Sequence, residues 1–230
     1  MYAQIHRTET PAFRNAGAPW GEIPATQQQV QEFEVDEPLF CQGDNANFVY
    51  ELLEGVVCCY NISSDGRRQV LSFGYPGDLI GLVQGDTHRY SSEVLVSARI
   101  LRIPRSMLLA TASQRPELGQ KLLRFATTEL AVMQDHFAIL GRKSAVEKVA
   151  AFLLASAKRC VDEDGLSATF DLPMTRADIG DYLGLTLETV SRSMTALKIS
   201  GAIDLPQPHT LVVRDILALE NIADEEGEHF

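Results

Sequence analysis

Two different patterns of apolar and polar residues divide the chain. Between residues 33 and 103, short apolar runs such as NFVYELLEGVVCCYNI and SSEVLVSARILRI are separated by turn-rich pieces such as QGDNA and SSDG. Many short strands at this spacing are typical of an antiparallel barrel or sandwich. Residues 1–30 contain three prolines and scattered charges, and we expect them to form an irregular arm.

From residue 117 to residue 141 the apolar period becomes that of a helix. One set of apolar residues forms an a/d seam of nearly three heptads, which predicts packing against a twin helix and therefore a homodimer. The seam consists of Leu123, Ala126, Leu130, Met133, Phe137 and Leu140. A second stripe, able to pack on the barrel, consists of Leu122, Phe125, Val132 and Ile139. A single buried core helix is the alternative, and in either case we expect Gly141 to end it.

The segment TRADIGDYLGLTLETVSRSMTALKIS, residues 175–200, has the pattern of two helices joined by a tight turn. Thr175 and Thr186 are suited to cap the two helices, and Gly184 to supply the left-handed turn residue. Small and apolar residues stand at the inward positions that a helix-turn-helix requires. These residues are Ile179, Gly180, Leu183, Leu185, Val190, Met194 and Leu197, with the more polar Ser193 among them. The following residues, AIDLPQPHTLVV, predict two short strands like those of a wing.

The exposed face of the second helix carries residue types that can read base edges. Arg192 can donate two hydrogen bonds to guanine, Glu188 can accept one from cytosine, and Leu187 can contact a thymine methyl group. Ser191 lies on the same face. Residues suited to phosphates stand at the starts of the two helices, namely Thr175, Arg176, Thr186 and Thr189. The alternative is that Glu188 and Arg192 form an ordinary surface ion pair, worth about 0–1 kcal/mol.

Composition and charge narrow the class of protein. The chain of 230 residues is 45% hydrophobic and has a net charge of −11, which argues against a protein that coats nucleic acid regardless of sequence. The acidity lies mostly outside residues 142–217, which carry nine basic and ten acidic side chains. No apolar stretch is long enough for a transmembrane helix, and the first residues do not resemble a secretory signal. We therefore expect a cytoplasmic protein without membrane contact.

The four cysteines form neither a disulfide framework nor a metal site. No CxxC or paired Cys/His spacing occurs, and Cys58 and Cys59 would point to opposite faces of one strand. We therefore expect no metal and no cofactor. Cys160, near the junction of two domains, is a candidate redox switch, although single cysteines are more often inert. Because no nucleophile–base pair, paired acids or phosphate-cradling glycine loop occurs, we do not expect an enzyme.

The stretch MTRADIGDYLGLTLETVSR resembles the DNA-binding signature of the CRP/FNR family of bacterial transcription regulators, in particular its FNR and FixK-like branches. QGDNANFVYELLEGVV and PGDLIGL resemble turns of that family's cyclic-nucleotide-binding-like barrel. The resemblance implies a homodimer on palindromic double-stranded DNA, in contact with RNA polymerase. It also implies base contacts by Glu188, Ser191 and Arg192 on a half-site like TTGAT. Leu187 stands where cyclic-AMP-responsive members have arginine, which argues against their target site.

The barrel departs from the sensors that the family uses. The first 40 residues contain no cysteine, which argues against the iron–sulfur cluster of FNR-type oxygen sensors. Leu82 stands where cyclic-AMP receptors have the glutamate that holds the ribose, and Tyr90 interrupts their Arg-Ser pair for the phosphate. Since an apolar side chain cannot accept a hydroxyl hydrogen bond, we expect no cyclic nucleotide. His88 and His136 are candidate haem ligands, but an exposed loop residue and a helix-face residue are the simpler interpretations.

The expected fold is α+β, with an N-terminal cyclic-nucleotide-binding-like antiparallel β-barrel (jelly roll), a long dimerisation helix and a C-terminal winged helix-turn-helix. The expected divisions are 1–30 for the arm, 31–113 for the barrel, 114–141 for the dimerisation helix, 142–217 for the DNA-binding domain and 218–230 for an acidic tail. The resulting hypothesis is a regulator, mainly an activator, of low-oxygen respiratory genes that needs no ligand. A regulator of the same family gated by haem or another small molecule is the alternative.

Overall fold

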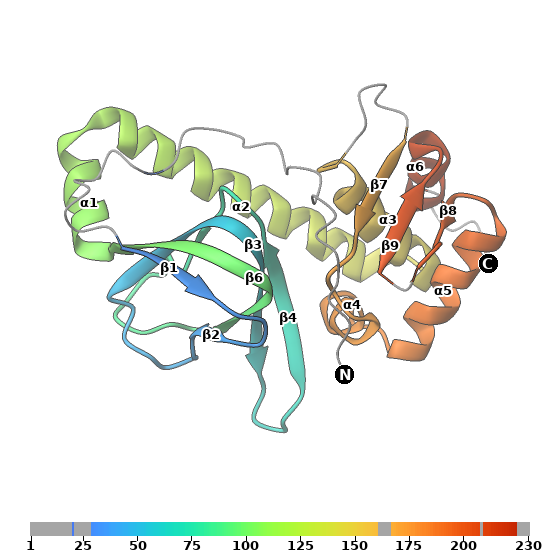
Figure 1. Ribbon diagram of the computed structural model, residues 1–230, viewed down its shortest axis with the longest axis horizontal. Helices are drawn as coiled ribbons and strands as arrows, with labels where there is room; N and C mark the ends of the chain where they lie inside the picture. The colour runs from blue at the N-terminus through green and yellow to red at the C-terminus, as the bar shows by residue number, and fades with distance from the viewer. Residues whose placement is uncertain (1–19, 21–28, 161–166, 208, 225–230) are drawn as a thin grey trace.

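The computed structural model describes Trp20 and residues 29–160, 167–207 and 209–224. In Figure 1 these residues form two lobes that are joined by one long helix. The first lobe consists mainly of strands, and the second consists of helices and a small sheet. The α+β fold expected from the sequence is therefore confirmed.

The first lobe is an antiparallel barrel built around two long strands, β3 (Phe48–Ile62) and β6 (Ser91–Pro104). The other strands are β1 (Gln29–Phe33), β2 (Pro38–Phe40), β4 (Arg68–Gly74) and β5 (Leu79–Ile80). Their order is β1-β6-β3-β4, with β2 also paired to β6 and β5 to β3. The β3–β6 register shifts between Leu52 and Val57. Such irregularities bend strands, which lets the two long strands curl around the barrel core.

Alternation along β3 sends its two neighbouring cysteines to opposite sides, as the sequence predicts. Cys59 packs in the barrel core, where its Sγ lies 3.6 Å from the hydroxyl oxygen of Ser92. The Cys58 Sγ instead accepts a hydrogen bond of 3.3 Å from the Arg68 guanidinium. The two thiols therefore have separate surroundings. In the described part of the chain, no three His, Cys, Asp or Glu side chains gather in a way that could hold a metal ion.

Two helices follow the barrel, α1 (Arg105–Gln114) and α2 (Pro116–Arg142). The short helix α1 is not anticipated by the sequence analysis, which places the barrel up to residue 113. The expectation that Gly141 ends the long helix is wrong, because α2 continues to Arg142. The chain turns only at Lys143, which is extended, and at Ser144, whose capping box with Glu147 starts the next helix. Among the described helices, none combines the length and the apolarity needed to cross a bilayer.

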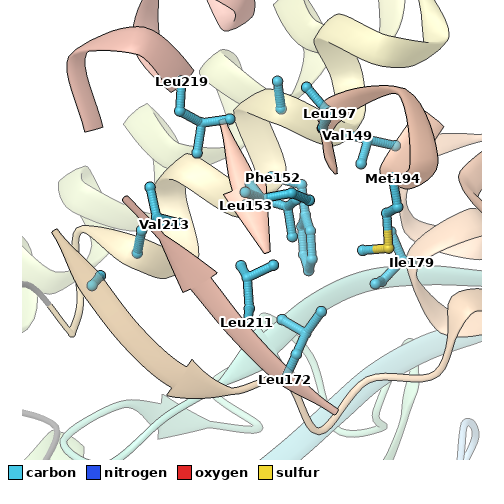
Figure 2. Close-up of a cluster of buried hydrophobic side chains, with 14 of the residues drawn as sticks. Val149, Phe152, Leu153, Leu172, Ile179, Met194, Leu197, Leu211, Val213 and Leu219 are labelled. Atoms are coloured by element: carbon cyan, nitrogen blue, oxygen red, sulfur yellow. The ribbon is translucent and has the colours of Figure 1, made fainter. Parts of the chain in front are cut away.

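The second lobe places four helices around a three-stranded sheet. Its elements are α3 (Ala145–Ala157), β7 (Ala168–Asp171), α4 (Arg176–Leu183), α5 (Leu187–Ile199), β8 (Ile203–Asp204), β9 (Thr210–Val213) and α6 (Ile216–Asp224). The sheet order is β7-β9-β8, so β8 and β9 form the two wing strands that the sequence predicts. Figure 2 shows how side chains of α3, α4, α5, α6 and the sheet fill one apolar core.

The helix α6 corrects the expected acidic tail. Residues 218–224 are helical, and Leu219 and Ala223 are buried in the core. The Lys143 ammonium donates a hydrogen bond to the Ala223 carbonyl, which ties the end of α6 to the start of the lobe. The expectation was wrong because the acidic side chains concealed an apolar stripe of helical period. Residues 225–230 lie outside the described residues.

Candidate nucleic-acid interface

The first helix of the predicted motif, α4, is tightly defined at both ends. Thr175 and Asp178 form a capping box, in which the Thr175 side chain accepts from the Asp178 N–H (3.1 Å) and the Asp178 carboxylate accepts from the Thr175 N–H (2.9 Å). Gly184 ends the helix at a φ of 65°. At Gly180 a Cβ atom would lie 2.6 Å from the Leu185 carbonyl oxygen, so only glycine permits this close crossing. The sequence predicts the cap at Thr175, the small residue at Gly180 and the turn at Gly184, but not the reciprocal hydrogen bond to the Asp178 carboxylate.

The second helix, α5, has one buried and one exposed face. Thr186 caps it by accepting a hydrogen bond of 3.2 Å from the Thr189 N–H. The buried face consists of Val190, Ser193, Met194 and Leu197. On the other face, Leu187 is 49% exposed, Glu188 and Arg192 are exposed, and Ser191 is half-buried. The structure thus brings the four residues expected to read bases together on one accessible surface.

Glu188 and Arg192 do not neutralise each other as an ion pair in the described structure. The Arg192 Nε instead donates to the Glu188 backbone carbonyl, at 3.4 Å. The pKa of Glu188 is lowered by a hydrogen bond from its own backbone N–H, by a second from the Thr186 side chain and by the nearby charge of Arg192. Glu188 is therefore a charged acceptor at neutral pH, with the charge of Arg192 close enough to stabilise it.

The residues expected to meet phosphates fall into two groups. Thr186 and Thr189 lie together at the start of α5, with their hydroxyl oxygens 3.0 Å apart. At the start of α4 the Thr175 hydroxyl already donates to the Asp178 carboxylate, at 2.6 Å. Arg176 beside it is half-buried, and this desolvation lowers its pKa without removing its charge at neutral pH. Arg176 is therefore the stronger candidate donor of the two.

The seam predicted on α2 is largely uncovered in the single chain. Leu123 is 65% exposed and Phe137 is 66% exposed, which is unusual for side chains of this size. The other seam residues are Ala126, Leu130 and Met133, which are exposed, and Leu140, which is half-buried. The second stripe divides: Leu122 and Phe125 pack on the barrel side with Trp20, and Ile139 packs on the second lobe. Val132 remains 47% exposed, so the expected stripe is broken at its middle.

Aromatic rings occupy the barrel interior behind the turn at Gly81. The Gly81 N–H donates to the Tyr90 hydroxyl, at 3.1 Å. The Phe40 ring stacks on His88 with 3.7 Å between centroids. A Cβ at Gly81 would lie 3.1–3.3 Å from atoms of His88, Phe40 and Tyr50. His88 is only 2% exposed, so its interpretation as an exposed loop residue is wrong. Burial lowers its pKa, and the ring is neutral at pH 7.

The two remaining candidate sensor residues are His136, which lies at a contact between the lobes, and Cys160, which lies near the end of α3. The His136 ring, on α2, stacks on Tyr182 of α4 with 4.0 Å between centroids. Desolvation lowers the pKa of His136, and a hydrogen bond with the Tyr182 backbone offsets only part of this effect. Cys160 follows α3 and is half-buried, which raises the pKa of its thiol. Since the thiolate is the reactive form, this environment favours the inert interpretation of Cys160.

One polar network, centred on Arg68, was missed by the sequence analysis. Arg68 lies on β4, and its guanidinium bonds to Asp178 of α4 across 110 positions of sequence. A pairing over such a distance has no local period or spacing, so no signal in one sequence could have found it.

Comparison with known proteins agrees with this geometry. The model of the Crp-like helix-turn-helix domain matches residues 147–222, and that of the cyclic nucleotide-binding domain matches residues 30–115. The Transcriptional activatory protein AadR of Rhodopseudomonas palustris is 41% identical over 162 residues, which are 70% of this chain and 68% of AadR. The Nitrogen fixation regulation protein FixK of Bradyrhizobium diazoefficiens is 40% identical over 171 residues, 74% of this chain and 72% of FixK.

The fold comparison extends the agreement to nearly the whole described chain. The solved structure of FixK2 from Bradyrhizobium japonicum matches with a TM-score of 0.80 at 36% identity. The match covers 87% of this chain and 99% of that one. The chain is therefore a DNA-binding transcription regulator and belongs to the CRP/FNR family, in its FixK/FNR branch.

Proposed function

We propose that this regulator binds, as a homodimer, a palindrome in which TTGAT and ATCAA are separated by four bases. The observation that carries this proposal is the accessible face of α5, where Leu187, Glu188, Ser191 and Arg192 lie side by side. This face has a bidentate donor, a charged acceptor, a hydroxyl and an apolar contact. These are the groups needed to read guanine, cytosine and thymine in the major groove.

Each residue has a distinct role in this proposal. Arg192 donates to O6 and N7 of the guanine, and Glu188 accepts from the opposite cytosine or the neighbouring adenine. Leu187 contacts a thymine methyl group, and Ser191 bonds to a base edge beside it. Arg176, Thr186 and Thr189 hold phosphates, with Thr175 beside them, so that α5 enters the groove in one register.

The proposed dimer forms through the exposed seam of α2. Exposed side chains of Leu123, Leu130, Met133 and Phe137 form an apolar surface on one helix. A second α2 packed against this surface would bury it by knobs-into-holes contacts. The twofold axis between the helices then gives the two α5 helices the symmetry of a palindrome.

We further propose that the barrel needs no small ligand. The rings of Phe40, Tyr50, His88 and Tyr90 pack closely behind Gly81, and the Tyr90 hydroxyl accepts a hydrogen bond from the Gly81 N–H. Leu82 offers no acceptor for a ribose hydroxyl. The proposed targets are genes of low-oxygen respiration, and activation proceeds through contact with RNA polymerase. The names of AadR, an activatory protein, and of FixK, a nitrogen fixation regulator, support an activating role.

Fluorescence anisotropy with labelled duplexes tests this function. The purified protein, without added ligand and at one stated salt concentration, is titrated into the palindrome and into a scrambled duplex. We expect binding to the palindrome to be at least about a thousandfold tighter, as is typical of specific sites. Equal binding to both duplexes would contradict the proposal. Preference that appears only after haem or another small molecule is added would favour the ligand-gated alternative.

A further inference from the structure

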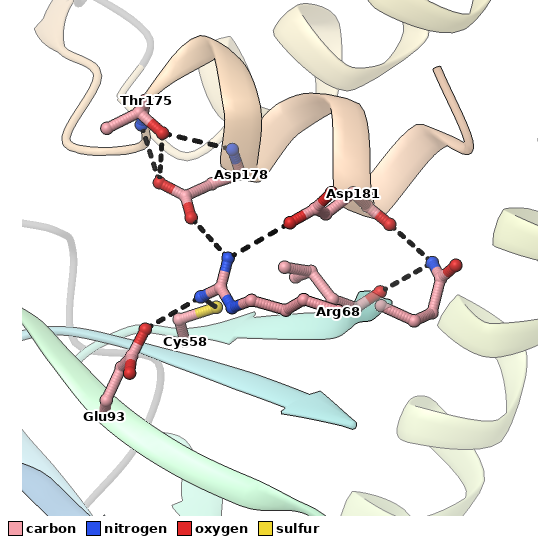
Figure 3. A network of polar contacts seen from close by, with 8 residues as sticks. Cys58, Arg68, Glu93, Thr175, Asp178 and Asp181 are labelled. Atoms are coloured by element: carbon pink, nitrogen blue, oxygen red, sulfur yellow. Dashed lines mark hydrogen bonds and ion pairs between the residues drawn. The ribbon is translucent and has the colours of Figure 1, made fainter. Parts of the chain in front are cut away.

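Arg68 of β4 connects the barrel to the helix-turn-helix. One of its terminal nitrogens lies 2.6 Å from an Asp178 carboxylate oxygen and 3.4 Å from one of Asp181, both on α4. The other lies 2.8 Å from a carboxylate oxygen of Glu93 on β6. Figure 3 shows this guanidinium between the sheet below and α4 above. One side chain therefore spans the two lobes with charged hydrogen bonds at both ends.

The barrel presents Arg68 in a defined orientation. Its guanidinium carbon lies 4.5 Å from the centre of the Tyr60 ring, and a terminal nitrogen donates to the Cys58 Sγ at 3.3 Å. The Arg68 side chain is only 25% exposed, so water screens its ion pairs less than those of a surface residue. Because a planar guanidinium presents its donors in a fixed fork, it constrains the orientation of its partners as well as attracting their charge.

On the second lobe, Arg68 contacts the first turn of α4. Asp178 forms the capping box of α4 with Thr175, so its carboxylate orients both the helix start and Arg68. Beside it, the Gln69 side-chain amide donates to the Asp181 carbonyl, at 2.5 Å. The Tyr182 ring lies 5.5 Å from that of Phe73 on β4, between centroids. The contact thus fixes α4 at several points along its length.

Fixing α4 also fixes the recognition helix. The Gly180 backbone packs against the turn at Leu185 that leads into α5, and α4 and α5 share one apolar core, so we expect α5 to follow α4. In a dimer formed through α2, the separation of the two α5 helices depends on how each unit docks on its own barrel. Changing the spacer by one base pair moves a half-site by about 3.4 Å and turns it by about 35°. A loosened unit would tolerate such a change better than a fixed one.

We propose that Arg68 is a positioning residue for DNA binding, which ties α4 to the barrel and thereby sets the distance between half-sites that the dimer accepts. This inference rests on the proposed function, because it assumes a dimer on a palindrome. It adds a determinant of spacing that lies on the barrel, outside the helix-turn-helix.

The test compares three variants, Arg68→Ala, Arg68→Lys and Arg67→Ala, on palindromes whose spacers run from two to six bases. Arg67 is the matched control, because it is exposed and pairs only with Asp65 of its own turn among the described contacts. We expect Arg68→Ala to lose at least about tenfold of the wild-type discrimination between spacers. The discrimination of Arg68→Lys should lie between those of Arg68→Ala and the wild type, because one ammonium group cannot make the forked contacts of a guanidinium. Arg67→Ala should behave as the wild type.

A second readout separates positioning from folding. Each duplex is also tested with the half-site guanine replaced, and the unfolding midpoint of each variant is measured. The proposal expects preference for guanine to persist in Arg68→Ala while preference for the spacer weakens. Unchanged spacer discrimination in a folded Arg68→Ala protein would overturn it, as would an equal loss of affinity for all spacers. If Arg68→Ala does not fold, unchanged discrimination in Arg68→Lys decides against the proposal. If the wild-type protein shows no preference for the palindrome, that result would instead contradict the proposed function.

Discussion

At the scale of single residues, DNA recognition depends on which atoms of α5 are free to contact the bases. Arg192 makes its described hydrogen bond through Nε to a backbone carbonyl, so its guanidinium is not tied to the Glu188 carboxylate. A bidentate contact from Arg to guanine discriminates against other bases by about 1–3 kcal/mol. Phosphate contacts position the protein but carry no base preference. Substitutions of Arg192 and of Arg176 should therefore weaken DNA binding in different ways.

We predict that Arg192→Ala weakens binding to the palindrome by about 1–3 kcal/mol and relaxes the preference at the guanine. Arg176→Ala, the matched control, should weaken all duplexes to a similar extent and lower the salt dependence of binding. Anisotropy titrations on single-base variants of the half-site measure both effects. An Arg192→Ala protein that still preferred guanine would show that α5 is not the helix that reads the site.

Asp178 gives a second prediction at this scale, through the dependence of stability on pH. Burial opposes ionisation of Asp178, but hydrogen bonds from Thr175 and Arg68 outweigh it and lower its pKa. A carboxyl group whose pKa is lowered on folding stabilises the protein above its unfolded pKa of about 4. That stabilisation is lost as the pH falls through the lower pKa of the folded state.

We expect Asp178→Asn to reduce the free energy of unfolding by about 1.5–3 kcal/mol at pH 7, the usual contribution of hydrogen bonds to a charged group. The difference from the wild type should shrink below about pH 4, where the wild-type carboxyl also becomes neutral. Urea unfolding at several pH values measures it. Asp181→Asn, whose ion pair with Arg68 is longer at 3.4 Å, should have a smaller effect. A difference that does not change with pH would contradict the role of the charge.

At the scale of elements, two helical glycines with opposite surroundings test the packing of α4 on α5. A Cβ at Gly180 would lie 2.6 Å from the Leu185 carbonyl oxygen, whereas one at Gly141 in α2 would meet nothing within 4 Å. Gly180→Ala should therefore destabilise the protein by about 1–3 kcal/mol through overpacking. Gly141→Ala should stabilise it by up to about 1 kcal/mol through helix propensity. Thermal unfolding distinguishes the two signs, and equal effects would contradict the close crossing.

The helix α2 carries the prediction about assembly. We expect Leu130→Asp to convert the dimer into monomers at micromolar concentration, because an unpaired carboxylate would be buried in the seam. Thr128→Asp is the control, since Thr128 is exposed on the side of α2 away from the seam. Analytical ultracentrifugation measures the dissociation constants. A Leu130→Asp protein that remains dimeric while Thr128→Asp dissociates would place the interface on another face.

At the scale of the whole molecule, the elements with a clear period were predicted and those held by distant contacts were not. Apolar runs between turn-rich pieces identified β3 and β6, the heptads identified α2, and the turn at Gly184 identified the helix-turn-helix. The short helix α1 was missed because its apolar residues follow no clear helical period, and α6 was missed because acidic residues around it concealed its apolar stripe. Trp20 was assigned to an irregular arm, yet it is 3% exposed, and its backbone N–H donates to the carboxylate of Glu51 on β3.

The same distinction applies to the site. The base-reading face could be predicted because helical spacing is visible in a single sequence. The link from Arg68 to Asp178 joins two lobes, and the ring cluster around His88 depends on how strands curl. Neither has a signature at any fixed spacing. The division between lobes is also less sharp than the expected domain limits, because Val56 and Tyr75 of the barrel belong to the same core as α3 and α5.

The central claim is that the unliganded chain is a dimer which reads one palindrome through α5. Selection from a random duplex library by the full chain, without added ligand and at fixed salt, tests this claim most directly. We predict enrichment of TTGAT and ATCAA half-sites in inverted orientation, four bases apart. Enrichment of single or directly repeated half-sites, of an unrelated sequence, or of no sequence at all would contradict it.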